Sequence, residues 1–234
     1  MARGLPKSLL DQLNPPQREA VVTLAGPMLV LAGAGTGKTR VVTFRIANLI
    51  RHGTLPQRIL AVTFTNKAAR EMKHRVGDLV QPRRSKKKDT DEDAMPIVAT
   101  FHAYCVQILR RHIQKLGYPE RFAIYDRGDQ EGLARKVLRE IRVTDTALKP
   151  SELLWCISSW KNRCIRPPEA LNVAETDKEH LAAVAYRRYQ RELKNAGAVD
   201  FDDLLLLTEE LFSSHSDVRR EVAERFVNLF IEEY

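Results

Sequence analysis

The chain has 234 residues, 44% of them hydrophobic, so it is long enough to bury one large core or two smaller ones. Its formal net charge of +8 favours a polyanionic partner, although a basic surface without such a partner explains the charge equally well. The three cysteines lack C-x-x-C spacing and no apolar run is long enough to cross a membrane, so we expect a protein of the reducing cytoplasm without disulfides, zinc or membrane contact.

Four short apolar segments bounded by turn residues are predicted to be buried strands: 28–32, 59–63, 97–100 and 227–231. Helical patterns separate the first three, which is typical of a mainly parallel α/β sheet. Residues from roughly 104 to 225 have helical periodicity and little strand signal, so we expect a helical insertion. We place the α/β domain at 1–103 and 198–234, and the inserted helical domain at 104–197.

The segment "QLNPPQREAV" (residues 12–21) predicts the start of a helix. Asn14 can cap a helix that opens at Pro15, and the amide of Gln17 can bond back to the cap backbone. Alternatively, the carboxamide of Gln17 matches the N6 and N7 edge of adenine. The local sequence favours the cap.

The segment "PMLVLAGAGTGKTRVV" (residues 27–42) predicts a phosphate-binding loop between a strand and a helix. Gly33, Gly35 and Gly37 permit backbone conformations that bring N–H groups close to phosphate oxygens at a helix N-terminus. Lys38 is placed to neutralise the outer phosphates, and the Thr39 hydroxyl to bind magnesium.

The strict loop pattern has glycine at the position of Ala32, which is a mild departure because alanine still permits a tight turn. The alternative is a glycine-rich turn that binds no ligand. A nucleoside triphosphate is the better prediction, because strand, loop, Gly-Lys-Thr and helix follow in the correct order.

Two charged segments are open to more than one interpretation. The run "RRSKKKDTDED" (residues 83–93) is predicted to be an exposed loop, with a nucleic-acid contact by its basic half as the alternative. In "VDFDDLL" (residues 199–205), Asp200, Asp202 and Asp203 suggest a metal site, but the string also begins an apolar helix. We interpret these acids as helix capping and favourable N-terminal charge.

The motifs "LNPPQREAV", "LAGAGTGKTR", "ILAVTFTNKAAREM", "VATFHAYCVQILRR", "VDFDDLL" and "FIEEY" follow one another as in the amino-terminal half of UvrD/Rep-type superfamily 1 DNA helicases. The resemblance runs from about residue 10 to the last residue. It implies a RecA-like P-loop NTPase parallel sheet with an inserted all-helical domain, and ATP and Mg²⁺ as cofactors. It also implies a helicase of the 3'–5' type that acts on single-stranded and duplex DNA in repair or replication.

The resemblance assigns roles in nucleotide binding and hydrolysis. Glu233 is expected to activate the attacking water, and Thr39 and Glu232 to hold magnesium. The family has aspartate where this chain has Glu232, a side chain one methylene longer that shifts the geometry by about an ångström. The nucleotide-binding positions implied by the family are Gln17, Ala32, Gly33, Ala34, Gly35, Thr36, Gly37, Lys38, Thr39 and Arg40.

Two segments resemble the family's single-strand contacts. In the first, Phe64 offers a face for base stacking, and Thr65, Asn66 and Lys67 can donate to the backbone. A core aromatic at the strand end is the alternative for Phe64. The second segment consists of Thr100, Phe101 and His102, of which His102 can also be read as a polar residue at a helix start.

The inserted domain resembles the family's accessory domain, and its basic residues are a possible extension of the DNA surface. This hypothesis rests on charge alone. The residues are Arg110, Arg111, Lys161, Arg163, Arg187 and Arg188.

In the family, a second motor domain supplies further catalytic residues, and the chain has no sequence for it. We therefore expect the chain to be an amino-terminal fragment that binds ATP weakly and unwinds little. Two alternatives stay open: a subunit of a helicase–nuclease of the related RecB type, and a non-catalytic module that binds nucleotide and DNA.

Overall fold

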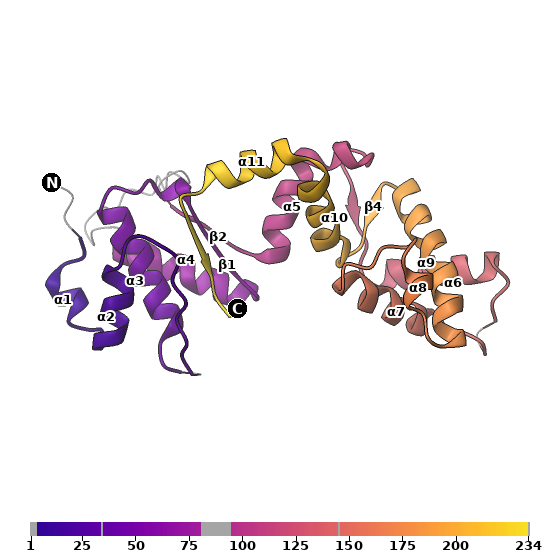
Figure 1. Ribbon diagram of the computed structural model, residues 1–234, viewed down its shortest axis with the longest axis horizontal. Coiled ribbons are helices and arrows are strands. Elements are labelled where there is room, and N and C mark those ends of the chain that lie inside the picture. Colours follow the sequence, from indigo (N-terminus) through magenta and orange to yellow (C-terminus); the bar gives the residue numbers. More distant parts are fainter. Residues whose placement is uncertain (1–3, 34, 81–94, 145, 234) are drawn as a thin grey trace. The chain divides into compact units, whose positions relative to one another are not determined.

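The computed structural model describes residues 4–33, 35–80, 95–144 and 146–233. The chain divides into two compact units, the first comprising Met1–Tyr104 with Arg220–Tyr234 and the second Cys105–Arg219 (Figure 1). The charged run at 83–93 and Ala34 lie outside the described residues, so the predictions made for them remain predictions.

A three-stranded parallel sheet is the centre of the first unit. Its strands β1 (Ile59–Thr63), β2 (Ile97–Thr100) and β5 (Asn228–Ile231) lie in the order β2-β1-β5. Every residue of β1 is buried, as expected for the central strand of a parallel sheet. The mixed α/β fold and three of the four predicted strands are confirmed.

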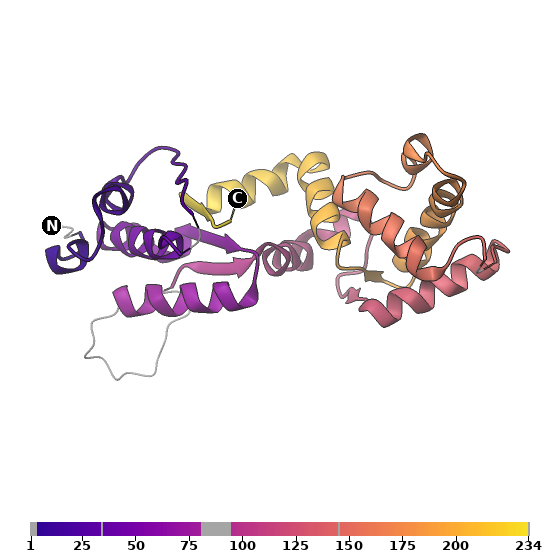
Figure 2. The ribbon, with the colours of Figure 1, turned by 90° about the horizontal axis from the view of Figure 1, so that it is seen from below.

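Helices α1 (Lys7–Leu10), α2 (Pro15–Val22), α3 (Lys38–Arg51) and α4 (Asn66–Val80) complete the first unit, with a 3₁₀ turn η1 (Pro56–Arg58) before β1. Figure 2 shows α4 running alongside β2. Ile46 of α3 and Met72 of α4 pack in one cluster with Ile59 and Ala61 of β1. Both helices therefore cover the same face of the sheet.

The predicted strand at 28–32 is wrong. These residues form no regular element, and the side chains of Leu29 and Leu31 are 72% and 87% exposed. A strand forms only where a neighbouring strand takes up its N–H and C=O groups. Within the described ranges, β5 pairs with β1 alone and no strand lies beside residues 28–32.

The second unit is mainly helical. Its first residue lies in α5 (Phe101–His112) and its last in α11 (Ser216–Arg225), so each of these helices has residues in both units. Tyr186, Tyr189 and Leu193 of α9 form its core with Leu153 and Ile157 of α7. No helix in the described part of the chain is long and apolar enough to span a membrane. Its other elements are η3 (Ile113–Leu116), β3 (Ala123–Ile124), α6 (Arg127–Glu140), α7 (Pro150–Asn162), α8 (Ala170–Val173), α9 (Asp177–Asn195), β4 (Ala198–Val199) and α10 (Asp203–Ser214).

The second unit ends at Arg219, later than the boundary at residue 197 that we expected. The cause is a short parallel pairing in which Ala123 and Ile124 of β3 lie beside Ala198 and Val199 of β4. Helix α10 also packs against η3 and α7. The segment after the long helix α9 is thereby held in the helical unit, and the insertion contains two short strands besides its helices.

Candidate functional site

Three segments of the predicted site meet at the carboxyl ends of the strands in the first unit. Thr63 at the end of β1 pairs in register with Thr100 at the end of β2. The N–H of Glu232 donates to the carbonyl oxygen of Val62 at 3.0 Å, so β5 continues its ladder for one more residue. This edge of a parallel sheet is where α/β proteins bind ligands.

The glycine-rich loop enters α3 through left-handed backbone conformations. Gly35 has a φ of 74° and Gly37, the N-cap of α3, a φ of 90°. Side chains with a Cβ are strained at such angles, so glycine is needed at both positions. The loop therefore ends at the first turn of a 14-residue helix, whose unpaired N–H groups favour an anion.

Lys38 is held by the backbone of its own loop. Its Nζ donates to the carbonyl oxygens of Ala32 and Gly33, each at 3.0 Å. The Thr36 hydroxyl donates to the same Gly33 oxygen at 2.7 Å. The loop thus curls around the ammonium group and holds a positive charge beside the start of α3.

The residues predicted to hold magnesium lie against each other. The Thr39 hydroxyl donates to Oε1 of Glu232, whose residue is 7% exposed. The second carboxylate oxygen, Oε2, is buried and has no hydrogen-bond partner among the described residues. An unpaired buried carboxylate oxygen beside a hydroxyl is a donor set that suits a hard divalent cation. The two residues therefore fit Mg²⁺.

Glu233, the predicted base, is exposed and lies directly after the buried Glu232. Its φ of 62° places it in the left-handed region, which turns the chain away from the strand direction. The two adjacent acids thus have different surroundings, one buried against Thr39 and the other facing solvent. Its role in activating water stays a prediction.

Gln17 forms the predicted cap and one further contact. Its N–H donates to Oδ1 of Asn14 at 2.9 Å, and its Oε1 accepts from the N–H of Asn14 at 3.1 Å. Its Nε2 donates to the carbonyl oxygen of Thr36 at 2.9 Å. Gln17 therefore joins α2 to the phosphate loop, a contact that local sequence could not reveal. Reading of adenine stays a prediction.

Arg40 lies in the first turn of α3, two residues after Lys38. Its Nη2 donates to Oε1 of Gln12 at 3.1 Å, and its guanidinium lies 5.4 Å from the centroid of the Phe44 ring. The side chain is thus directed along α3 toward the segment that precedes α2. Its part in nucleotide binding stays a prediction.

Phe64 is 60% exposed directly after β1, which is incompatible with the core role considered for it. Its ring centroid lies 5.4 Å from that of Phe101, at an interplanar angle of 56°. The Thr65 hydroxyl accepts the N–H of Ala68 at 3.1 Å and so begins α4. Asn66 and Lys67 follow it, and both are exposed.

The second predicted DNA segment is less accessible than the first. Thr100 is 7% exposed, and its hydroxyl accepts the N–H of Ala103 at 3.1 Å at the start of α5. Phe101 and His102 are half-buried. Of the side chains in the two segments, that of Phe64 offers the largest exposed aromatic surface.

The prediction that Lys161 belongs to an exposed basic surface is wrong, because this residue is buried. Its Nζ lies 2.6 Å from Oδ2 of Asp200 and 2.7 Å from Oδ1 of Asp203, and all three side chains are buried. Burial, with the nearby Asp200, raises the pKa of Asp203 to about 6 although Lys161 opposes the shift. The N–H of Asp203 donates to Oδ1 of Asp200 at 2.9 Å. The Asp200 and Asp203 carboxylates thus bond to each other's N–H groups at the start of α10, whereas Asp202, the N-cap of this helix, makes no side-chain cap bond, and an ammonium group lies between Asp200 and Asp203.

Other basic residues of the second unit also have local partners. Arg110 donates to the carbonyl oxygen of Phe122 at 2.6 Å, and Arg188 to Glu140 at 2.7 Å. Arg111, Arg163 and Arg187 are exposed. Of the six basic residues, Lys161 is thus buried, Arg110 and Arg188 are engaged with local partners, and the extension of the DNA surface stays a prediction for the others.

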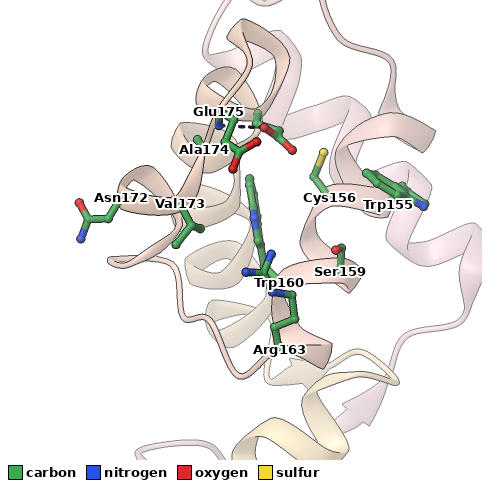
Figure 3. A pocket seen from close by; sticks show the side chains of 10 residues that line it. Trp155, Cys156, Ser159, Trp160, Arg163, Asn172, Val173, Ala174 and Glu175 are labelled. Atoms are coloured by element: carbon green, nitrogen blue, oxygen red, sulfur yellow. Dashed lines mark hydrogen bonds between the residues drawn. The ribbon is translucent and has the colours of Figure 1, made fainter.

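A cavity of about 420 Å³ lies in the second unit, between α7 and the segment that joins α8 to α9 (Figure 3). Trp155, Trp160 and Arg163 line one side, and Asn172 and Glu175 the other. It contains none of the residues predicted to bind nucleotide or magnesium.

Comparison with known proteins agrees with the family resemblance that the motifs indicated. The family described as "UvrD/REP helicase N-terminal domain" matches residues 13–234. The "ATP-dependent DNA helicase PcrA" of Leuconostoc citreum is 40% identical over 229 residues, and that of Bacillus subtilis is 40% identical over 227. Each alignment covers 97% of this chain and 30% of the relative. The chain thus spans about 30% of the length of these curated relatives.

Proposed function

Because the chain belongs to the UvrD/REP helicase N-terminal domain family, as its motifs predicted, we propose that it is the ATP-binding motor domain of an ATP-dependent DNA helicase. The observation that carries the proposal is the meeting of three features at one sheet edge. The phosphate loop with Lys38, the pair of Thr39 and Glu232, and the exposed Phe64 all lie there.

ATP binding would use groups that are now paired within the loop. Lys38 would exchange its two carbonyl partners for phosphate oxygens, and the N–H groups at the start of α3 would bind the same phosphates. Magnesium, when bound, would neutralise phosphate charge between Thr39 and Glu232. Glu233 would take the proton from the water that attacks the γ-phosphorus as the bond to the ADP oxygen breaks.

DNA binding would begin at the residue that follows the buried strand. Phe64 directly follows Thr63, the last residue of β1. A base stacked on the Phe64 ring would therefore lie near the carboxyl end of the strand, where the predicted nucleotide site also lies. We propose that the whole protein uses this proximity for 3'–5' translocation and unwinding in repair or replication. The relatives named as helicases are longer proteins, of which the chain spans 30%, so we expect this chain to bind DNA without separating strands.

The proposal predicts that Phe64→Ala weakens single-strand binding. Stacking of one base on an aromatic ring contributes about 1–3 kcal/mol, so the affinity for a fluorescent oligothymidine should fall by about 5-fold to 150-fold in anisotropy titrations. The salt dependence should stay the same, because no phosphate contact is lost.

Two further variants make this test specific. Lys67→Ala should also weaken binding, but it should lower the slope of log affinity against log salt by about one because it removes a phosphate contact. Trp155→Ala removes an aromatic side chain that is 69% exposed in the second unit and should leave affinity unchanged. Equal affinity of Phe64→Ala and the parent chain would contradict the proposed DNA contact.

A further inference from the structure

A row of polar side chains crosses the sheet on the face covered by α3 and α4. Ile59 and Ala61 face these helices, and side chains alternate along a strand, so Thr63 points to the same face. Thr100 pairs with Thr63 in register, and Glu232 lies opposite Thr63 because it follows the paired residues Val62 and Ile231. The order across the sheet is therefore Thr100, Thr63, Glu232.

Two atoms in this row lack partners. Thr63 is 0% exposed, and its Oγ1 has no hydrogen-bond partner among the described residues. The same holds for Oε2 of Glu232, while Oε1 accepts from Thr39. Neighbouring strands lie about 4.8 Å apart, so one water molecule can bridge such side chains.

The unpaired state of Thr63 is unexpected for a central strand. Buried hydroxyl groups almost always have a partner, and valine would fill the same space without a polar atom. Thr100, at the same register position, has its hydroxyl paired with the N–H of Ala103. The Thr63 hydroxyl therefore needs a partner from outside the described chain, on the side of Glu232.

We propose that Thr63 is a positioning residue of the nucleotide site. Its hydroxyl donates to a water molecule that also binds Oε2 of Glu232, and this bridge keeps the carboxylate directed at the magnesium position beside Thr39. The proposal rests on the proposed ATP-binding function and adds to it a residue of the segment "ILAVTFTNKAAREM". Because Phe64 is the next residue, the same bridge connects the magnesium side of the site to the proposed base-stacking surface.

The test uses Thr63→Val, which removes the hydroxyl with little change in shape. Binding of a fluorescent ATP analogue is followed at rising Mg²⁺ concentration and, separately, in EDTA. The Mg²⁺ concentration for half-maximal effect should rise about tenfold, as expected for loss of one hydrogen bond to a charged group. Binding in EDTA should be unchanged. Thr63→Ser keeps the hydroxyl and should stay within about twofold of the parent chain.

Thermal melting separates a positioning role from damage to the fold. Thr63→Val without ligand should melt close to the parent temperature, because the hydroxyl bonds to no atom of the described residues and its removal breaks no bond within the fold. Thr208→Val is the matched control: this buried threonine of the second unit donates to the carbonyl oxygen of Leu204 at 2.7 Å, and its loss should not alter the Mg²⁺ response.

The outcomes are distinguishable. If the parent chain binds the analogue with a Mg²⁺ response and Thr63→Val responds identically, the Thr63 bridge is wrong and the proposed function stands. If Thr63→Ser loses the response as completely as Thr63→Val, the hydroxyl is not the group that acts, and the bridge is wrong. If the parent chain binds no nucleotide at any Mg²⁺ concentration, the proposed function fails and the bridge fails with it.

Discussion

Lys38→Ala is expected to reduce ATP binding by about 100-fold or more, because it removes at least two hydrogen bonds from a charged donor, each contributing about 1.5–3 kcal/mol. In the structure the Lys38 ammonium donates to the carbonyl oxygens of Ala32 and Gly33, each 3.0 Å from Nζ. The ammonium group is therefore already directed into the loop, and phosphate oxygens need only replace two carbonyl partners.

The measurement is a titration of a fluorescent ATP analogue with Mg²⁺ present. Lys73→Ala serves as the matched control, since Lys73 is an exposed lysine of α4 in the same unit, and it should bind as the parent chain does. Circular dichroism should show the same helix content in all three proteins. Undiminished binding by Lys38→Ala would show that the glycine-rich turn is not the phosphate site.

Features built from local pattern were predictable, and features built from distant contacts were not. The strands at 59–63 and 97–100 are short apolar runs between turn residues, and both exist. The run at 28–32 has the same appearance but no strand beside it among the described residues, and pairing cannot be read from a single segment. The cap by Asn14 was predictable because its partner Gln17 lies three residues away.

Two features of the second unit that local pattern did not reveal have the same origin. Lys161 looked like a surface residue because charge normally indicates exposure, but its partners Asp200 and Asp203 lie about forty residues further along the chain. The compact second unit extends past the expected boundary at residue 197, and the pairing of β3 with β4 that holds residues 198–199 in it joins two-residue segments that carry almost no strand signal. In both cases the interaction that decides the structure is non-local.

Lys161→Met is expected to destabilise the second unit by about 3–5 kcal/mol at neutral pH, because two buried carboxylates lose the cation between them. The side chains of Lys161 and Asp203 are 0% exposed and that of Asp200 is 4% exposed, so water cannot replace the ammonium. Both tryptophans of the chain, Trp155 and Trp160, lie in this unit, so urea unfolding followed by tryptophan fluorescence reports on it directly.

Two further variants test whether the loss of stability in Lys161→Met comes from burial of the ion pair. Lys178→Met removes a 2.7 Å pair with Glu152 whose partners are 56% and 38% exposed, and it should cost less than about 1 kcal/mol. Combining Lys161→Met with Asp200→Asn and Asp203→Asn removes all three charges and should recover most of the lost stability. A single Lys161→Met with parent-like stability would mean that the buried charges do not depend on one another.

The pH profile gives the sign of the carboxylate's contribution. Burial raises the pKa of Asp203 from 3.8 to about 6, so the folded chain binds this proton more tightly than the unfolded chain does. The stabilisation that the folded chain gains from holding this proton on Asp203 is complete below about pH 4 and is lost as the pH rises through about 6. The difference in unfolding free energy between the parent chain and Asp203→Asn should therefore decrease over this range.

Lys161 loses its proton at a much higher pH than Asp203 does, so the titrations of the two groups do not overlap. Burial opposes its charge, yet Asp203 and Asp200 raise its pKa above the ordinary value, so it stays an ammonium throughout the acidic range. Without that cation the pKa of Asp203 should rise further, because burial and Asp200 then act unopposed. Lys161→Met should consequently be least destabilising near pH 5 and most destabilising near pH 8. A deficit that is constant with pH would show that Lys161 contributes by packing and not by charge.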